Sequence, residues 1–276
     1  MIKRKRMLPE GWYPFHKNET EAYLDGWSRT DSHSHENNAI AAIAPHAGWY
    51  YSGRIAWSAW LSAIQADEVL IIGGHLQAGS AFRYWKHDVF ESPFGDIKAA
   101  TELVSFLRYS CNAEEDNSVD NTIEVHLPMM AYRFPGATLA CFRAPNDKRS
   151  AELGVAAASY AKTAGKRLFV LASTDMTHYG KSYEFEPAGH GAKGFAWARK
   201  KDEALCEAFL SVDMDKALLL AARDSSACSV GAAVAAMTYA SEMGYTSSKL
   251  LMRGSSDEMH LNSDASVGYC SIAFMS

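Results

Sequence analysis

The sequence predicts an α/β protein: a three-layer α/β/α sandwich with a mostly parallel central sheet. Three observations predict this fold. Short, wholly apolar runs are typical of strands covered on both faces. Amphipathic segments of helical period alternate with these runs, and the connections are long enough for parallel crossovers. Because neither an internal repeat nor a low-complexity linker divides the chain, we expect one domain over 1–276.

Strands are expected at six short apolar runs. The first two are AIAAIA at 39–44, which ends at Pro45, and VLIIG at 69–73. The others lie at 138–143, 167–172, 248–253 and 265–274. A polar loop joins the last two runs, so they can also form an antiparallel pair.

Helices are expected between these strands. Apolar residues recur at i, i+3, i+4 and i+7 in 57–64 and again in 100–107. The other amphipathic stretches lie at 149–164, 199–210, 213–222 and 228–243. Gly165, directly after one of them, is typical of the left-handed residue that ends a helix.

Composition and charge exclude several classes of protein. A formal net charge of −5 without a broad basic surface argues against nucleic-acid binding. The basic cluster at 3–6 is expected to be a solvated tail. No apolar run reaches the ~18 residues of a membrane span, and none of signal-peptide type follows the basic cluster. Five cysteines without a CxxC pair indicate a reducing cytoplasm.

Ligand-type side chains follow three of the predicted strands. The run 39–44 leads to His46, 69–73 leads to His75, and 167–172 leads to Asp175 and His178. Ligands of open α/β sheets bind beyond the carboxyl ends of the strands. If these strands are parallel, the four side chains meet at one edge of the sheet. Each histidine alone is more simply a loop residue bonded to backbone, so the joint occurrence carries the prediction.

Three more candidates lie elsewhere in the chain. Cys228 stands at the expected first turn of the helix 228–243, where unpaired N–H groups and the helix dipole favour a thiolate. Glu124 and His126 lie in NTIEVHLPMM, before Pro128. The simpler alternatives are a small buried hydrophobe for Cys228 and a solvated face for Glu124.

Two imidazoles and one anionic ligand are the minimal set that holds a divalent transition metal with open positions. His46, His75 and Cys228 supply that set, at spacings unlike those of a local zinc finger. On spacing alone, a metal site and an unrelated set of residues are equally good interpretations. The two glycines before His75 indicate a sharp turn or a close approach of the backbone to a neighbour.

Aromatic residues and a glycine-rich stretch are candidates for the walls of a pocket. Trp49, Tyr50 and Tyr51 follow His46, although such residues more often pack in a core. The stretch 179–198 contains four glycines and a proline. It is expected to be a lid over the pocket or, equally, a surface loop.

Motifs along most of the chain resemble those of the Memo family, the second component of the AmmeMemoRadiSam gene set. APHAGWYYSG resembles the family's APHAGY-x-YSG, and LPEGWYPFHKNETEAYL resembles its opening segment. VLIIGGH takes the place of its strand and GPSH, and NTIEVHLPMM resembles S-I-E-x-HLP. LASTDMTHYG resembles SSD-x-xH-(Y/W)G, and SACSVGAAVAAM resembles the CG-x-x-(P/G) segment at a helix start.

The resemblance implies a fold and a site. The Memo family is similar in fold to the catalytic subunits of class III extradiol dioxygenases (LigB-like), whose non-haem iron is bound by two histidines and a glutamate. By motif, the implied metal ligands are His46, His75 and Cys228. The residues implied to line the same pocket are Asp175, His178, Glu124 and His126.

This chain departs from the family pattern in two places. The segment GGHLQ, which contains His75, lacks the proline and serine of the family's GPSH, which predicts a shorter loop. Ser229 follows Cys228 where the family commonly has glycine, which predicts a stiffer backbone.

The expected function is a metal-dependent oxidoreductase or dioxygenase-like activity on a small, phenolic substrate. Iron is the first choice of metal and copper the second, with zinc third, because a thiolate is softer than a carboxylate. His178 would act as acid and base, Asp175 would orient it, and Trp49 and Tyr51 would contact the substrate. The alternatives are a non-catalytic protein that binds a peptide or partner in the same cleft, and a zinc hydrolase.

Overall fold

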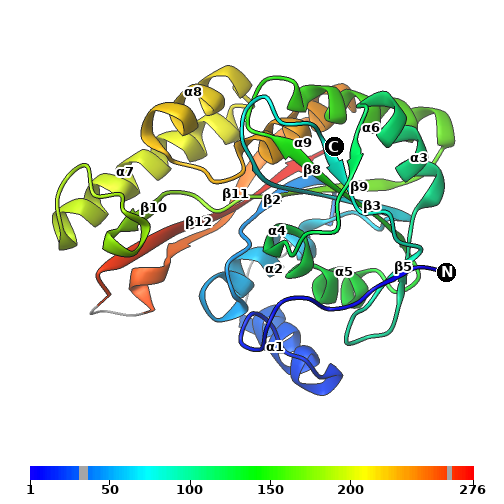
Figure 1. Ribbon diagram of the computed structural model, residues 1–276, viewed down its shortest axis with the longest axis horizontal. Helices are drawn as coiled ribbons and strands as arrows, with labels where there is room; N and C mark the ends of the chain where they lie inside the picture. Colours follow the sequence, from blue (N-terminus) through cyan, green and yellow to red (C-terminus); the bar gives the residue numbers. More distant parts are fainter. Residues whose placement is uncertain (31–36, 260–262) are drawn as a thin grey trace.

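The computed structural model describes residues 1–30, 37–259 and 263–276, and it has the predicted α/β architecture (Figure 1). Four parallel strands form the centre of the sheet, in the spatial order β2 (Ala39–Ala44), β9 (Leu168–Ser173), β3 (Glu68–Leu76) and β8 (Thr138–Pro145). Their side chains alternate between two cores: Leu70 and Ile72 belong to one, Val69 and Ile71 to the other. The strands are therefore covered on both faces, as their unbroken apolar character predicts.

Both flanks add antiparallel neighbours, so the sheet as a whole is mixed. β12 (Ala265–Met275) is antiparallel to β2, and both β10 (His178–Gly180) and β11 (Ser247–Ser255) are antiparallel to β12. On the other flank, β4 (Arg83–Tyr84) is antiparallel to β8 and parallel to β7 (Glu114–Glu115). The parallel prediction holds for the four central strands, and the antiparallel alternative for the late strands is confirmed.

Helices cover both faces of the sheet and complete the three layers (Figure 1). One face carries α3 (Thr101–Ser110), α6 (Ser150–Ala164), α7 (Gly191–Leu210), α8 (Met214–Asp224) and α9 (Val230–Glu242). The other carries α1 (Lys17–Thr30), α2 (Arg54–Ser62), α4 (Asn121–Glu124) and α5 (Leu127–Arg133). Among the described residues, no helix is both long and apolar enough to cross a membrane.

Two predicted helix boundaries bear on the site. α6 ends before Gly165, which adopts the expected left-handed conformation (φ 61°). α9 begins at Val230, with Ser229 before it, so the prediction of a helix from residue 228 is wrong at its start. Cys228 therefore lies in the connection that precedes the helix.

The stretch 179–198 contains more regular structure than a lid or surface loop would. It begins in β10, continues as the 3-10 helix Lys181–Tyr183, and enters α7 at Gly191. The buried ring of Tyr179 anchors it, because its hydroxyl donates to the carbonyl of Gly189 (2.7 Å). A side chain at Gly194 would collide with the Tyr179 ring, so this glycine permits packing and does not signal a loop.

The prediction that the basic cluster at 3–6 is a solvated tail is also wrong. Lys3–Arg4 forms β1, which pairs in parallel with β5 (Val89–Phe90), and β5 pairs with β6 (Ile97–Lys98). Arg4 is buried, and its guanidinium lies 3.5 Å from the centre of the Trp85 ring. A weakly hydrated guanidinium packs well on an aromatic face, which explains its burial.

Candidate metal centre

Two strand ends and the connection before α9 bring the predicted ligands together. β9 lies between β2 and β3, so the carboxyl ends of these parallel strands are neighbours. His46 follows β2, and His75 lies near the end of β3. Together with Cys228 they form a cluster whose ligand atoms all lie within 4.8 Å of one another.

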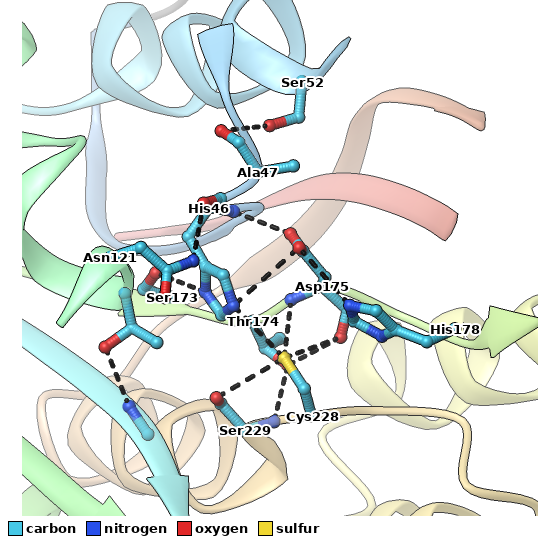
Figure 2. Close-up of polar contacts among 12 residues, drawn as sticks. His46, Ala47, Ser52, Asn121, Ser173, Thr174, Asp175, His178, Cys228 and Ser229 are labelled. Atoms are coloured by element: carbon cyan, nitrogen blue, oxygen red, sulfur yellow. Dashed lines mark hydrogen bonds and ion pairs between the residues drawn. The ribbon is translucent and has the colours of Figure 1, made fainter. Parts of the chain in front are cut away.

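His46 is fixed by contacts from three directions (Figure 2). Its ring is 1% exposed, and its Nδ1 lies 2.9 Å from Ser173 Oγ. Its backbone N–H donates to Asp175 Oδ1 (2.7 Å), and its carbonyl accepts from Asn121 Nδ2 (3.2 Å). Burial, with His178 nearby, lowers the pKa of His46 to about 3, so the imidazole is neutral, the form that binds a metal.

His75 reaches the site through a distorted strand. β3 continues to Leu76, and its pairing with β8 slips between Gly73 and Leu76, so His75 sits in a bulge. Its φ of 58° is a left-handed conformation, which costs a residue with a side chain about 1–2 kcal/mol. A bulge re-aims a side chain, and backbone strain of this kind clusters at functional sites. The prediction of a shorter loop is thus replaced by a bulge inside the strand.

The two glycines before His75 permit a close backbone approach, one of the two alternatives that they predict. A Cβ on Gly73 would collide with the Thr122 hydroxyl, and a Cβ on Gly74 would collide with the Ser229 side chain. Ser229 Oγ also accepts the backbone N–H of His75 (3.2 Å). The two departures from the family pattern, at Gly74 and at Ser229, are therefore in contact with each other. The Ser229 side chain fills the space that a side chain at position 74 would need.

Cys228 faces His46 across the site. Its Sγ lies 3.2 Å from His46 Nε2 and accepts the backbone N–H of Asp175 (3.3 Å) (Figure 2). Burial, reinforced by the Asp175 carboxylate, raises the pKa of the Cys228 thiol to about 12. The thiolate expected from a helix N-terminus is therefore disfavoured, and a bound cation would have to displace the thiol proton.

Asp175 and His178 lie beside the cluster. Asp175 is buried, and its Oδ2 lies 3.8 Å from His46 Nε2 and 4.0 Å from His178 Nε2. His178 Nδ1 lies 3.1 Å from the carbonyl of Met176. Because a carbonyl only accepts, Nδ1 carries the proton and Nε2 of the neutral ring has its lone pair free. The carbonyl of Met176, more directly than Asp175, orients His178.

A cavity of about 600 Å³ opens over the cluster. His46, His75, Asp175 and His178 all contribute to its lining. The rest of its wall comes from distant parts of the chain and includes Glu10, Trp12, Tyr51, Asn121, Tyr183 and Tyr269. The described residues of the lining include two carboxylates and no lysine or arginine.

Glu124 and Trp49 do not line this cavity. Glu124 accepts hydrogen bonds from Met7 N (3.0 Å), Leu8 N (2.8 Å) and the Tyr13 hydroxyl (3.1 Å), and so ties down the N-terminal segment. Trp49 is buried in the core, where its indole N–H donates to the carbonyl of Val125 (2.9 Å). Both support the cavity indirectly, because the N-terminal segment supplies Glu10 and Trp12.

His126 lies behind His46, on the side away from the cavity. It is wholly buried, and its Nε2 lies 3.1 Å from the same Ser173 Oγ that contacts His46. Sequence reasoning did not single out Ser173 or Asn121. A signal for Ser173 exists, because a polar S-T-D run directly after an apolar strand is unusual in a buried position.

Fold and site together define a class: α/β/α sandwiches with a candidate mononuclear metal centre at the carboxyl edge of parallel strands. Within it, the chain belongs to the Memo-like protein family, whose sequence profile matches residues 4–273. A MEMO1 family protein of Methanosarcina barkeri is 30% identical over 244 residues, 86% of this chain and 87% of its own. One from Pyrobaculum arsenaticum is 30% identical over 86% of this chain and 83% of its own. One from Nitrosopumilus maritimus is 26% identical over 99% of both chains.

A solved structure shares the fold at much lower sequence similarity. The crystal structure of the uncharacterized protein JW3007 from Escherichia coli K12 is similar to this chain with a TM-score of 0.54. The similarity covers 85% of this chain and 98% of that one, at 10% identity. It supports the α/β architecture and carries no information about activity.

Proposed function

We propose that this Memo-like protein binds a redox-active transition metal on His46, His75 and Cys228 and acts on a small aromatic substrate. Iron is the first choice of metal and copper the second, with zinc third. The observation that carries the proposal is the convergence of three ligand atoms within 4.8 Å beside a cavity of about 600 Å³, which His46 and His75 help to line.

The donor set fits such a metal. Bonds of ~2.0–2.3 Å to nitrogen and sulfur place two ligands of a tetrahedral ion roughly 3.5 Å apart. His46 Nε2 and Cys228 Sγ are 3.2 Å apart, and the widest pair in the cluster is within 4.8 Å. A small contraction, within reach of the exposed His75 ring, would bring all three into bonding range.

The surrounding side chains suit oxidation of a phenolic compound. A redox metal held by His46, His75 and Cys228 would supply one-electron chemistry at this site. His178, whose Nε2 lone pair is free, would accept the proton of a substrate hydroxyl. Trp12, Tyr51 and Tyr183 line the cavity and would hold a planar ring by stacking and edge contacts.

The charge of the cavity argues against a phosphopeptide as its ligand. Phosphate is recognised by Arg or Lys side chains, and the described lining residues include Glu10 and Asp175 but neither Arg nor Lys. A non-catalytic protein that binds another peptide, and a zinc hydrolase, are the alternatives that the experiment must separate from the oxidoreductase.

Metal analysis of protein purified without chelators tests the proposal. Wild type should carry stoichiometric metal, and His46→Ala, His75→Ala and Cys228→Ser should lose it. Cys111→Ser is the matched control, because this buried cysteine belongs to the core. Equal metal content in all five proteins would overturn the ligand set.

Activity then separates the candidate functions. An oxidoreductase should consume O₂ with a catechol-like compound, in proportion to its iron or copper content. Zinc-loaded protein that hydrolyses esters or amides without O₂ would favour the hydrolase. A metal-free protein that binds a peptide in the cavity would favour the binding protein.

A further inference from the structure

A series of buried, hydrogen-bonded side chains leads from the core to the side of His46 that faces away from the cavity. The indole N–H of Trp60 donates to His126 Nδ1 (3.3 Å). His126 Nε2 lies 3.1 Å from Ser173 Oγ, which in turn lies 2.9 Å from His46 Nδ1. None of the four side chains is more than 1% exposed. Buried polar groups without partners are costly, so the series is stable only as a connected set.

Trp60, at the end of the series farthest from His46, sets the direction in which the hydrogen bonds are donated. An indole N–H donates and never accepts, so His126 Nδ1 must present its lone pair to Trp60. Burial keeps His126 neutral, and its single proton is therefore on Nε2. That proton is donated to Ser173 Oγ.

Ser173 then has two ways to meet His46. If its hydroxyl donates to His46 Nδ1, the proton of the neutral His46 ring is on Nε2 and faces Cys228 Sγ. If its oxygen accepts, the proton is on Nδ1 and the Nε2 lone pair faces the cluster. Only the second arrangement leaves His46 able to bind a metal, because the coordinating nitrogen must be unprotonated.

We propose that Ser173, His126 and Trp60 are positioning residues: when Nε2 of His46 binds the metal, Ser173 Oγ accepts the Nδ1 proton, and His126 and Trp60 hold that oxygen in place. The inference rests on the proposed metal centre and adds the groups that orient one of its ligands. Partners of this kind fix the tautomer and ring orientation of a metal-binding histidine. His126 thus acts from behind the ligand and does not touch the substrate.

Zn²⁺, a redox-inert probe of the same ligands, measures the effect on affinity by calorimetry. Ser173→Ala and His126→Leu should weaken Zn²⁺ binding by about 10–100-fold. Ser173→Thr keeps the hydroxyl and should retain most of the affinity. Ser271→Ala is the matched control, because Ser271 is also buried in a strand and bonds to another hydroxyl, Ser58 Oγ (2.6 Å).

Nitrogen-15 NMR of histidine-labelled protein reads the tautomers directly, a property that a purely structural role would not change. Zn²⁺-loaded wild type should show His46 protonated on Nδ1 and His126 on Nε2. Trp60→Phe removes the terminal donor and should abolish the preference of His126 for Nε2.

The outcomes separate the two proposals. Wild type that binds no Zn²⁺ would overturn the metal centre and the positioning role with it. Tight Zn²⁺ binding by both wild type and a folded Ser173→Ala would overturn the positioning role alone. A His126 proton found on Nδ1 in wild type would also overturn it.

Discussion

His46 and His75 reach the same site by opposite means. His46 follows a regular strand, is buried, and is held by Ser173, Asp175 and Asn121. His75 is exposed to the cavity, has a left-handed backbone, and is held through its backbone N–H by Ser229. One proposed ligand is fixed by side-chain contacts, and the other is oriented by a strained backbone in a bulge.

The difference indicates how the site can be both precise and adaptable. A ring enclosed by buried hydrogen-bond partners keeps its orientation with or without a metal. A ring on a strained bulge can move a short distance when a cation draws the ligands together. The two regions should therefore respond differently to substitution.

The largest effect is expected where the bulge packs against Ser229. Gly74→Ser places a side chain on that of Ser229 and should cost about 3 kcal/mol of unfolding free energy, as overpacked cores do. Ser229→Gly alone removes the acceptor for the His75 N–H and should cost about 1 kcal/mol. The double variant should recover most of the loss in urea denaturation. Additive losses would show that the two positions do not compete for one space.

A pH experiment extends the comparison to the segment that carries His178. Asp202 is buried and accepts from both the N–H (3.1 Å) and the hydroxyl (2.6 Å) of Thr177. Burial raises its pKa from 3.8 to about 6, so between these values the folded state retains a proton that the unfolded state has lost. This group's contribution to stability therefore falls as pH rises from about 4 to 6, by about 3 kcal/mol in total.

Asp202→Asn isolates that contribution. The variant should gain stability relative to wild type as pH rises from about 4 to 6. Above about pH 6 the difference in unfolding free energy between the two proteins should be constant. Urea denaturation at several pH values measures it. A difference that does not change with pH would contradict the assignment to Asp202.

Removal of the enclosed ligand should be destabilising even without a metal. His46→Ala leaves a cavity beside Ser173 and removes that hydroxyl's partner, so metal-free protein should lose about 2 kcal/mol. Thermal and urea denaturation in a chelator measure it. A metal-free variant as stable as wild type would mean that His46 is not locked by its contacts.

Removal of the strained ligand should have the smallest effect and the opposite sign. His75→Gly relieves about 1–2 kcal/mol of left-handed strain and loses about 0.5–1 kcal/mol through the flexibility of glycine. In metal-free protein the variant should gain up to about 1.5 kcal/mol, and it should no longer bind the proposed metal. His16→Gly, at an exposed position without a left-handed backbone, is the control and should not gain stability. A loss at His75→Gly would show that the bulge is unstrained.

Much of the fold follows from sequence because its signals are local. The four central strands are short apolar runs, and alternation of such runs with amphipathic helices predicts their parallel order. The meeting of His46 and His75 also follows from their strand-end positions, and the motif resemblance adds Cys228. Non-local strand pairings cannot be predicted in this way. No pattern in the sequence of 265–275 indicates that this strand inserts between β10 and β2.

The parts of the site that sequence reasoning missed depend on contacts between distant residues. The motif resemblance predicts that Glu124 lines the pocket, but the N-terminal segment covers it and is bound to it by hydrogen bonds from Met7, Leu8 and Tyr13. Trp60 reads as one apolar position on a helix, and only its distance to His126 shows that its N–H matters. A hydrogen-bond partner more than sixty positions away leaves no periodic pattern to detect.

The distance along the chain between the proposed ligands also determines when the site can assemble during translation. His46 and Cys228 are 182 positions apart, and ribosomes add 5–20 residues per second. The cysteine is therefore made roughly 10–40 seconds after the histidine. In that interval any ion that meets the nascent protein finds an incomplete set of donors, so the proposed site could bind its metal only after residue 228 has been synthesised.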